Sequence, residues 1–434
     1  MTRFTGTCRT TAASVLVLLA AGCGAATSVT GSPSAERPVS PASESSSAPG
    51  TPRAGGGTPA AGASAAGPPG GASSTCQGAG TVRLDSAAYP SGVPALAAVE
   101  FVSAAQGWVA GADGILATSD GGASWAADYS GPDKVYQVDF TDAGHGWAVG
   151  TAGLLATSDG GRTWTALPEP CGLVDSVHFV SPVRGYAVVG ASGVTLDAGT
   201  PTAGNGGRLE ETSDGGRSWS AVPGAPDQVT SACFGTAEDG YLGTPGKVWR
   251  STDGGADWSV SLSEPAAANG QGEPPGDPAV ECADSGAWAL ILDGGAAMNH
   301  SPYLAYATPD GGQWHAVLEE TYTESALHPQ VHAPDGPGTY PGPFSVISPS
   351  SAAYLGWTPP AGLGAAPLDT VAGGTTIAKH GNVGGLTQPF AAAFLSASEG
   401  WVVGTDQTSA GQAGPAVVEH TSDGGRAWTR QYTS

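Results

Sequence analysis

The sequence predicts an all-β protein, a seven-bladed β-propeller whose blades each hold four antiparallel strands. The main observation is a phrase that recurs along the chain: Phe, five residues, Gly-Trp, a short apolar run, then Thr-Ser-Asp-Gly-Gly-x-Ser/Thr-Trp. Each copy holds four short β-runs, and repeats of about 40–50 residues with four strands are typical of propeller blades. The composition agrees, because 69 Gly suit many tight turns and 12 Trp need a core.

The phrase occurs seven times, in varying states of completeness. The first four copies run from the Phe to the Trp, with Gly-Tyr replacing Gly-Trp in the third and fourth. The fifth box is one residue short, the sixth copy has lost its Asp phrase, and the seventh is nearly complete. The copies begin at Phe101, Phe140, Phe179, Phe234, Val280, Ile347 and Phe394. The Asp phrase supplies six aspartates: Asp120, Asp159, Asp214, Asp253, Asp310 and Asp423.

Each Asp phrase predicts a tight turn between the third and fourth strands of a blade. The Thr or Ser hydroxyl and the Asp carboxylate can accept backbone N–H groups, and the glycines supply the positive φ angles that such a turn needs. The Trp that follows is expected to pack against neighbouring strands where the chain re-enters the sheet. We therefore expect these residues to be structural.

The N-terminus has the pattern of an export signal. Arg3 and Arg9 precede an apolar run over 12–21, which is too short to cross a hydrocarbon core of about 30 Å. Leu19 to Cys23 resembles the lipobox of bacterial lipoproteins, in which the Cys becomes the acylated first residue. We expect residues 1–22 to be a lipoprotein signal peptide and Cys23 to anchor the protein to the outer face of the cell membrane. An ordinary cleaved secretory signal is the alternative.

The composition of residues 23–75 predicts a disordered tether, and we expect residues 76–434 to form the propeller domain. The tether is almost wholly Ala, Gly, Pro, Ser and Thr, so it has too little apolar surface to offset the entropy of ordering. The whole chain has a net charge of −23. This charge excludes nucleic-acid binding through phosphate neutralisation and favours cationic partners or divalent ions.

The repeat also resembles known families. Thr157-x-Asp159-x-Gly161-x-Thr163-Trp164 is similar to the Asp-box (BNR) motif of sialidases, xyloglucanases and other propellers. Gly-Trp-Ala-Val-Gly over 146–150, followed by that box, most resembles the photosystem II stability/assembly-factor type of seven-bladed propeller. The resemblance covers about residues 95–434. It implies this fold, an assembly role and an Arg-rich partner patch, whereas only 11 Lys and Arg follow residue 75.

Long connections are expected to gather on one face of the ring. The gap between the unit Gly and the box hydroxyl is 11 residues in blades one, two and four, but 27 in blade three, from Gly185 to Thr212. It is 22 and 21 residues in blades five and seven, and the connections between blades lengthen after Trp258 and Trp314. In a four-stranded blade both kinds of connection leave on the same side. We call that side the insert face, and we expect it to bind the partner through blades three to seven.

Candidate chemistry is limited to two groups of residues. The residue before each Phe is Glu100, Asp139, His178 and Cys233 in four consecutive blades, which could form an ion or proton-transfer site at the axis, or simply line a wet channel. The segment 315–343 carries His315, Glu319, Glu320, His328 and His332, but Pro329 favours a solvated loop over a metal site. We expect no metal and no cofactor.

Four cysteines remain in the body, and an exported protein is expected to oxidise them. Cys233 and Cys282 lie near the first strands of neighbouring blades and are the predicted pair, which leaves Cys76 with Cys171. Together these observations favour a lipid-anchored, extracytoplasmic, monomeric and non-catalytic propeller that binds a protein or glycan. The alternative is a carbohydrate-active hydrolase, sialidase- or xyloglucanase-like, that uses the axial carboxylates.

Overall fold

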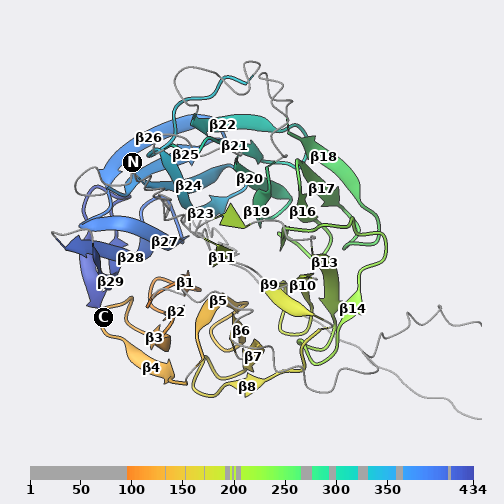
Figure 1. Cartoon of the computed structure of the whole chain (residues 1–434), viewed down its shortest axis with the longest axis horizontal. Coiled ribbons are helices and arrows are strands. Elements are labelled where there is room, and N and C mark those ends of the chain that lie inside the picture. The colour runs from red at the N-terminus through yellow and green to blue at the C-terminus, as the bar shows by residue number, and fades with distance from the viewer. Residues whose placement is uncertain are drawn as a thin grey trace, which may run out of the picture. The chain divides into compact units, whose positions relative to one another are not determined.

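The computed structural model is a seven-bladed β-propeller, as the repeat predicts (Figure 1). It describes residues 95–434 apart from 132, 152, 171, 191–195, 198–199, 202–206, 265–275, 293–299, 321–330, 358–364 and 409–411. The predicted signal peptide, Cys23, the tether, Cys76, Cys171 and His328 lie outside the described residues. Within the described residues, there is no helix with the length and apolar character that a membrane crossing requires.

Blades one to four come from four consecutive segments of the chain. Blade one holds β1 (Ala98–Phe101), β2 (Gly107–Gly111), β3 (Gly114–Thr118) and β4 (Ala126–Tyr129). Blade two holds β5 (Val135–Phe140), β6 (Gly146–Gly150), β7 (Gly153–Thr157) and β8 (Thr165–Ala166). Blade three holds β9 (Leu173–Phe179), β10 (Gly185–Gly190), β13 (Arg208–Thr212) and β14 (Ser220–Ala221), with β11 (Leu196–Asp197) and β12 (Thr200–Pro201) paired separately. Blade four holds β15 (Ser231–Phe234), β16 (Gly240–Thr244), β17 (Lys247–Ser251) and β18 (Ser259–Ser263).

Blades five to seven complete the ring in the same way. Blade five holds β19 (Pro278–Ala283), β20 (Gly286–Leu292), β21 (Tyr303–Thr308) and β22 (His315–Glu320). Blade six holds β23 (Tyr340–Ser348), β24 (Ser351–Trp357), β25 (Pro367–Ala372) and β26 (Thr376–Asn382). Blade seven holds β27 (Leu386–Phe394), β28 (Gly400–Thr408), β29 (Gln412–Thr421) and β30 (Thr429–Thr433).

Every blade is a contiguous antiparallel sheet whose strands lie in chain order from the axis outward. No strand is therefore exchanged between the first and last described blades. In the described residues the ring closes by contacts between complete blades, with β1 packed against β27 and β28 (Figure 1).

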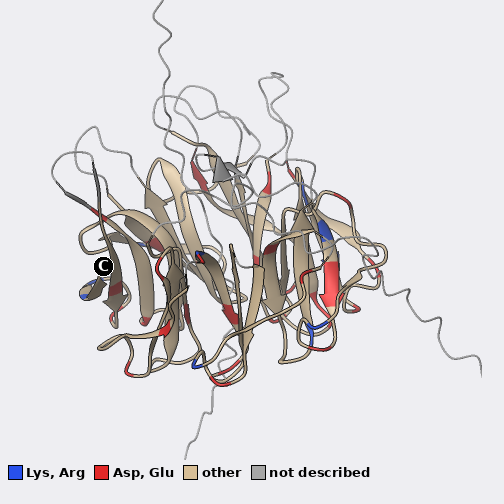
Figure 2. Ribbon diagram, turned by 60° about the horizontal axis from the view of Figure 1, so that its bottom comes forward, with Lys and Arg blue, Asp and Glu red and all other residues tan. Residues whose placement is uncertain are grey.

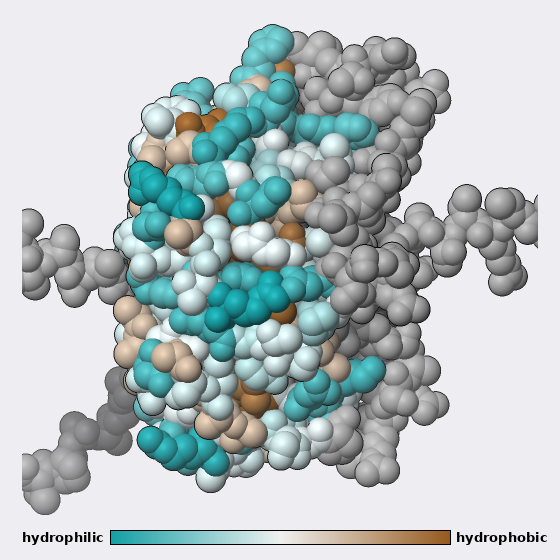
Figure 3. Space-filling model, turned by 90° about the vertical axis from the view of Figure 1, so that its left-hand side faces the viewer, coloured by the Kyte–Doolittle hydropathy of each residue, from teal (hydrophilic) through white to brown (hydrophobic). Residues whose placement is uncertain are grey.

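The hydrophobic core lies between the blades rather than at the axis. Seven buried clusters each draw mainly on two neighbouring blades, and one of them joins blade seven to blade one through Trp401, Phe101 and Val109. The outer rim is different in character. On the side formed by blades six and seven, hydrophilic and intermediate residues cover most of the described surface, and the hydrophobic residues form only small separate spots (Figure 3).

Candidate functional site

The Phe and the Gly-Trp of the repeat meet across the junctions between blades. Trp108 of blade one stacks on Phe140 of blade two, with ring centroids 3.5 Å apart and an interplanar angle of 7°. Four of the seven junctions have this stack, and the others are Trp147 on Phe179, Tyr186 on Phe234 and Trp401 on Phe101. Each of the four phenylalanines also receives the box Trp of its own blade edge-on, as Trp164 meets Phe140 at 5.9 Å. The repeat therefore encodes contacts between blades as well as strands.

The same aromatic residues bond to the box turn of the next blade. The indole Nε1 of Trp108 donates to the Gly160 carbonyl at 3.2 Å, and that of Trp147 donates to the Gly215 carbonyl at 3.1 Å. Trp401 reaches the Gly121 carbonyl at 3.2 Å, which ties blade seven to blade one. Each buried N–H is thus satisfied by a neighbour, so the aromatic packing and the turn depend on each other.

The Asp boxes have the predicted turn chemistry. In blade one, Gly122 N donates to Thr118 Oγ1 at 2.8 Å, and Ser124 N donates to Asp120 Oδ1 at 2.8 Å. The Ser124 hydroxyl donates to the other carboxylate oxygen at 2.6 Å. These bonds favour the ionised carboxylate, and the pKa of Asp120 is lowered, chiefly by the Ser124 hydroxyl. The same backbone N–H to carboxylate bond forms in the second, third, fourth and seventh boxes, which are therefore structural turns. In the shortened fifth box Asp310 accepts the N–H of Gly312 at 2.9 Å.

The axial residues form a set of bonds between blades. Glu100 Oε2 accepts the backbone N–H of Phe140 at 2.9 Å, and Asp139 Oδ2 accepts that of Phe179 at 2.6 Å. His178 Nε2 lies 2.8 Å from the Phe234 carbonyl, so it must be the protonated ring nitrogen and donate. Each side chain reaches from the first strand of its own blade to the first strand of the next one.

The interpretation of these residues as a wet channel lining is therefore wrong. Glu100, Asp139 and His178 are buried, with 2%, 3% and 3% of their surface exposed, because they point at the neighbouring blade and not into an open axis. Burial raises the pKa of Asp139 to about 8. It also raises the pKa of Glu100 well above its usual range, with the Asp139 charge adding to the effect. Burial lowers the pKa of His178. The geometry accounts for these residues as inter-blade contacts.

Two further axial residues were missed by the sequence analysis. Glu281 Oε2 accepts the N–H of Val346 at 3.0 Å, and Ser345 Oγ accepts that of Phe394 at 3.0 Å. Glu281 pairs with Trp288 across β19 and β20, as Glu100 pairs with Trp108 in blade one. Cys282, not Val280, therefore occupies the Phe position of blade five, and the sequence alignment of that blade was wrong by two residues.

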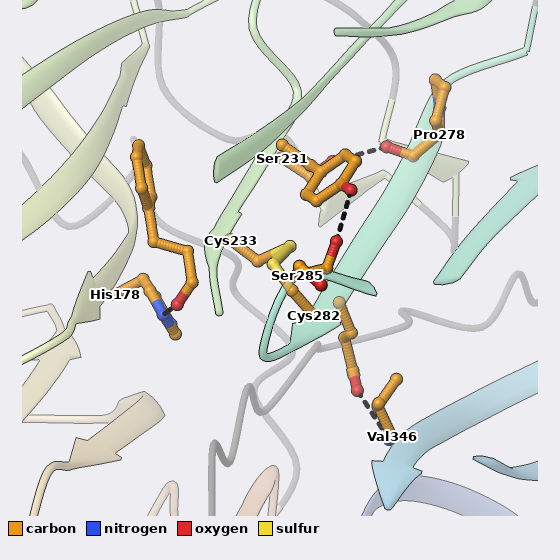
Figure 4. Close-up of a disulfide and its surroundings, with 10 residues drawn as sticks. His178, Ser231, Cys233, Pro278, Cys282, Ser285 and Val346 are labelled. Carbon is orange, nitrogen blue, oxygen red and sulfur yellow. Dashed lines mark hydrogen bonds between the residues drawn. A yellow bond between two sulfur atoms is a disulfide. The ribbon is translucent and has the colours of Figure 1, made fainter. Parts of the chain in front are cut away.

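The predicted Cys233–Cys282 disulfide is confirmed, and it joins β15 of blade four to β19 of blade five (Figure 4). Cys233 occupies the axial position of blade four, since it pairs with Tyr241 as Glu100 pairs with Trp108. The disulfide is thus the covalent member of the axial series. The predicted Cys76–Cys171 pair lies outside the described residues.

The insert face is defined by the strand registers. In blade three, Gly190 pairs with Leu173 and Val189 with Arg208, so the end of β10 and the starts of β9 and β13 lie at one edge. Most of the long connections that leave this edge lie outside the described residues.

The segment 315–343 is not a loop throughout, because His315, Glu319 and Glu320 belong to β22. Glu320 Oε1 lies 2.7 Å from His300 Nδ1. Among the described residues no group of side chains has the geometry of a metal site.

The Lys and Arg residues of the described body are dispersed over the ring (Figure 2), and its arginines make ion pairs or hydrogen bonds. Arg250 pairs with Asp239 at 2.8 Å, Arg208 with Glu210 at 2.7 Å, and Arg430 with Glu419 at 2.7 Å. The box arginines donate to the carbonyl of their own box aspartate, and they are Arg162, Arg217 and Arg426. The arginines in the described part of the chain therefore do not form the patch that the family resemblance implies.

Several solved propellers are similar in structure. YCF48 from Cyanidioschyzon merolae is 14% identical with a TM-score of 0.46, and the match covers 71% of this chain and 92% of that one. The GH74 enzyme of Niastella koreensis is 13% identical with a TM-score of 0.35, over 76% of this chain and 55% of that one. The GH74 xyloglucanase of Xanthomonas campestris is 14% identical with a TM-score of 0.35, over 76% and 63%. No curated protein matches the sequence.

A family model gives a more specific result. The model described as "Photosynthesis system II assembly factor YCF48" matches residues 129–359, which is more than half of the chain and runs from the end of blade one into blade six. This range contains the second, third, fourth and fifth Asp boxes. The chain belongs to the YCF48 family of photosystem II assembly-factor propellers.

Proposed function

We propose that this protein is a membrane-tethered, extracytoplasmic scaffold that binds a protein or glycan partner without chemical turnover. The proposal follows the assembly role that its family name carries. In it, the lipidated Cys23 and the segment to residue 75 hold the propeller at the outer face of the membrane. The partner meets the insert face of blades three to seven.

One observation carries the non-catalytic part of the proposal: the axial side chains are used between blades. Glu100, Asp139 and His178 each bond to the backbone of the next blade and are almost fully buried. A hydrolase needs its acid and its nucleophile or base on either side of a bound sugar. Side chains that hold two blades together are poorly placed for that role, whereas the fold remains a rigid support for loops.

The binding part is tested by shortening the inserts. Blade two joins its second and third strands through Thr151 and Ala152 alone, so that connection can replace residues 191–207 of blade three. Partners of the native chain are first captured by crosslinking and mass spectrometry on intact cells. The shortened variant is expected to lose the captured partner, while Arg217→Ala on the opposite face keeps it. Unchanged capture by the shortened variant would contradict the proposed face.

The tether is tested separately. Cys23→Ala removes the proposed acylation site and leaves the propeller unchanged. We expect the variant to leave the membrane fraction while partner capture in detergent extracts persists. A variant that stays in the membrane fraction would contradict the lipid anchor but not the binding face.

One observation favours a second candidate, a glycoside hydrolase. Glu100 and Asp139 are neighbouring carboxyls with raised pKa values, and such pairs occur in glycosidase sites. A screen against reporter glycosides, with Glu100→Gln and Asp139→Asn as controls, separates the two functions. Turnover that disappears in both variants would favour the hydrolase, and no turnover by the native chain is expected here.

A further inference from the structure

The junction between blades four and five departs from the pattern of its neighbours. At the preceding junction, Tyr186 stacks on Phe234, and Trp258 meets Phe234 edge-on at 6.0 Å. At the four–five junction the Phe position holds Cys282. Tyr241 takes over the edge contact, meeting Trp314 at 6.0 Å and 90°. Two aromatic rings therefore meet at the four–five junction, whereas three rings meet at the preceding one.

The residue opposite Cys282 has changed in step. In blades one, two, three, four and seven a glycine pairs with the Phe, because a Cβ there would overlap the Phe ring, as at Gly240 and Phe234. In blade five Ala287 pairs with Cys282, and the small sulfur side chain leaves room for its methyl group. The residue opposite the Phe position is therefore matched to a cysteine side chain and not to a Phe ring.

The axial hydrogen bond is replaced at the same place. Glu100, Asp139, His178, Glu281 and Ser345 bond non-covalently to the next blade, whereas Cys233 is covalently bound to Cys282. The two cysteines are buried, with 0% and 5% exposed. The disulfide lies in the buried hydrophobic cluster that joins blades four and five, with Val248 and Val280 among its members. Two hydrogen bonds lie near it: Ser231 Oγ donates to the Pro278 carbonyl at 2.6 Å, and Tyr241 OH donates to the Ser285 carbonyl at 2.8 Å (Figure 4).

We propose that the junction of blades four and five is a redox-dependent seam in the ring. With the disulfide formed, the first strands β15 and β19 are held together covalently. A dithiol reductant transfers two electrons and two protons to the bond, giving two thiols while the reductant becomes a cyclic disulfide. The reduced seam keeps its apolar contacts and its hydrogen bonds, which include Arg250 Nη1 to the Gly311 carbonyl at 2.6 Å and Trp314 Nε1 to Ser261 Oγ at 2.8 Å. It has neither a stacked Phe nor an axial bond, so it opens more often than the other junctions.

Hydrogen exchange on the folded, oxidised full chain tests this seam directly. The chain is treated with dithiothreitol, thiols are titrated by alkylation at each time point, and exchange is measured by mass spectrometry. As thiols appear at Cys233 and Cys282, peptides of β15, β16, β19 and β20 are expected to exchange at least about tenfold faster. Peptides of β5, β6, β9 and β10, at the junction of blades two and three, are expected to keep their rates. Re-oxidation should restore the original pattern.

Two variants serve as controls. Cys233→Ala/Cys282→Ala should show the fast exchange at the seam without reductant and no further change with it. Glu100→Gln, at the junction of blades one and two, should leave the reductant response at β15 and β19 unchanged. The proposal is overturned if thiols appear while exchange at β15 and β19 stays the same. It is also overturned if all seven junctions loosen equally, or if the double variant unfolds throughout, because the bond would then support the whole ring and not one seam.

Discussion

The indole of Trp401 lies flat on the ring of Phe101, with centroids 3.6 Å apart and planes within 9°, so the last described blade stacks on the first. The same indole donates to the Gly121 carbonyl, and Gln431 Nε2 donates to that carbonyl at 2.8 Å. Ala393 stands at the axial position of blade seven and has no polar group to offer. The junction of blades seven and one therefore depends more on its aromatic stack than the junctions that also have an axial hydrogen bond.

Trp401→Ala should lower the free energy of unfolding by about 3–5 kcal/mol, because it leaves a cavity at the closing junction. Chemical denaturation measures the loss, and hydrogen exchange should locate the loosening in β1, β2, β27 and β28. Trp401→Phe is the matched control: it keeps a ring on Phe101 but loses the indole N–H, at a cost of about 1 kcal/mol. Loosening that begins elsewhere in the ring would contradict this account of closure.

Gly146→Ala should destabilise the protein by about 2 kcal/mol or more, because the new methyl group would overlap the Phe140 ring. Gly144→Ala provides the control in the adjoining turn. A Cβ at Gly144 would meet Asp142 Oδ1 only at 3.4 Å. Thermal unfolding of both variants checks the difference, and equal losses would show that the close approach to Phe140 is not what requires glycine.

The repeat could be predicted from the sequence because its chemistry is local. The hydroxyl, carboxylate and glycines of a box lie within a few residues of one another, so spacing alone fixes the turn, and Thr118, Asp120 and Gly122 form it as expected. The Cys233–Cys282 pair followed from the same regularity. Local chemistry therefore predicted the fold and one covalent link.

The direction of the axial side chains could not be predicted in this way. In a half-buried strand, alternating polarity shows which residues face the core, but all six residues of β5 are buried. Asp139 therefore has no exposed neighbour in its strand to indicate a face. The alignment of blade five was wrong for another reason. The turn between its first two strands is shorter, so Cys282 and not Val280 takes the Phe position, while the spacing from Val280 to Gly286 still matches the phrase.

Ala427→Ser should stabilise the last box. In the first box, the Ser124 hydroxyl donates to Asp120 Oδ2, whereas Asp423 in the seventh has only the Ala427 backbone N–H at the equivalent position. A serine hydroxyl there would add one charge-assisted hydrogen bond at an exposed turn, which we expect to raise Tm by about 1–2 °C. Ser124→Ala should lower Tm by a similar amount. No change in either direction would show that solvent already satisfies this oxygen.

Asp139→Asn should remove part of the loss of stability at alkaline pH. The pKa of Asp139 is raised by burial to about 8, above its value in the unfolded chain, so the folded state favours the protonated carboxyl. Its contribution is full below the unfolded pKa of about 4 and is lost as pH rises through about 8. The ionised carboxylate would also face Glu100, whose pKa is raised by burial and by that charge.

The side-chain amide of Asp139→Asn still accepts the Phe179 N–H but cannot ionise. The variant should therefore be more stable than the native chain at pH 9, by at least about 1 kcal/mol, and similar to it at pH 5. Urea denaturation between these pH values checks the slope. Asp120→Asn in the first box is the control: hydrogen bonds lower the pKa of Asp120, so its own contribution changes only in acid and the slope between pH 5 and pH 9 should stay unchanged. Parallel profiles for the native chain and Asp139→Asn would show that Asp139 remains ionised in its inter-blade bond.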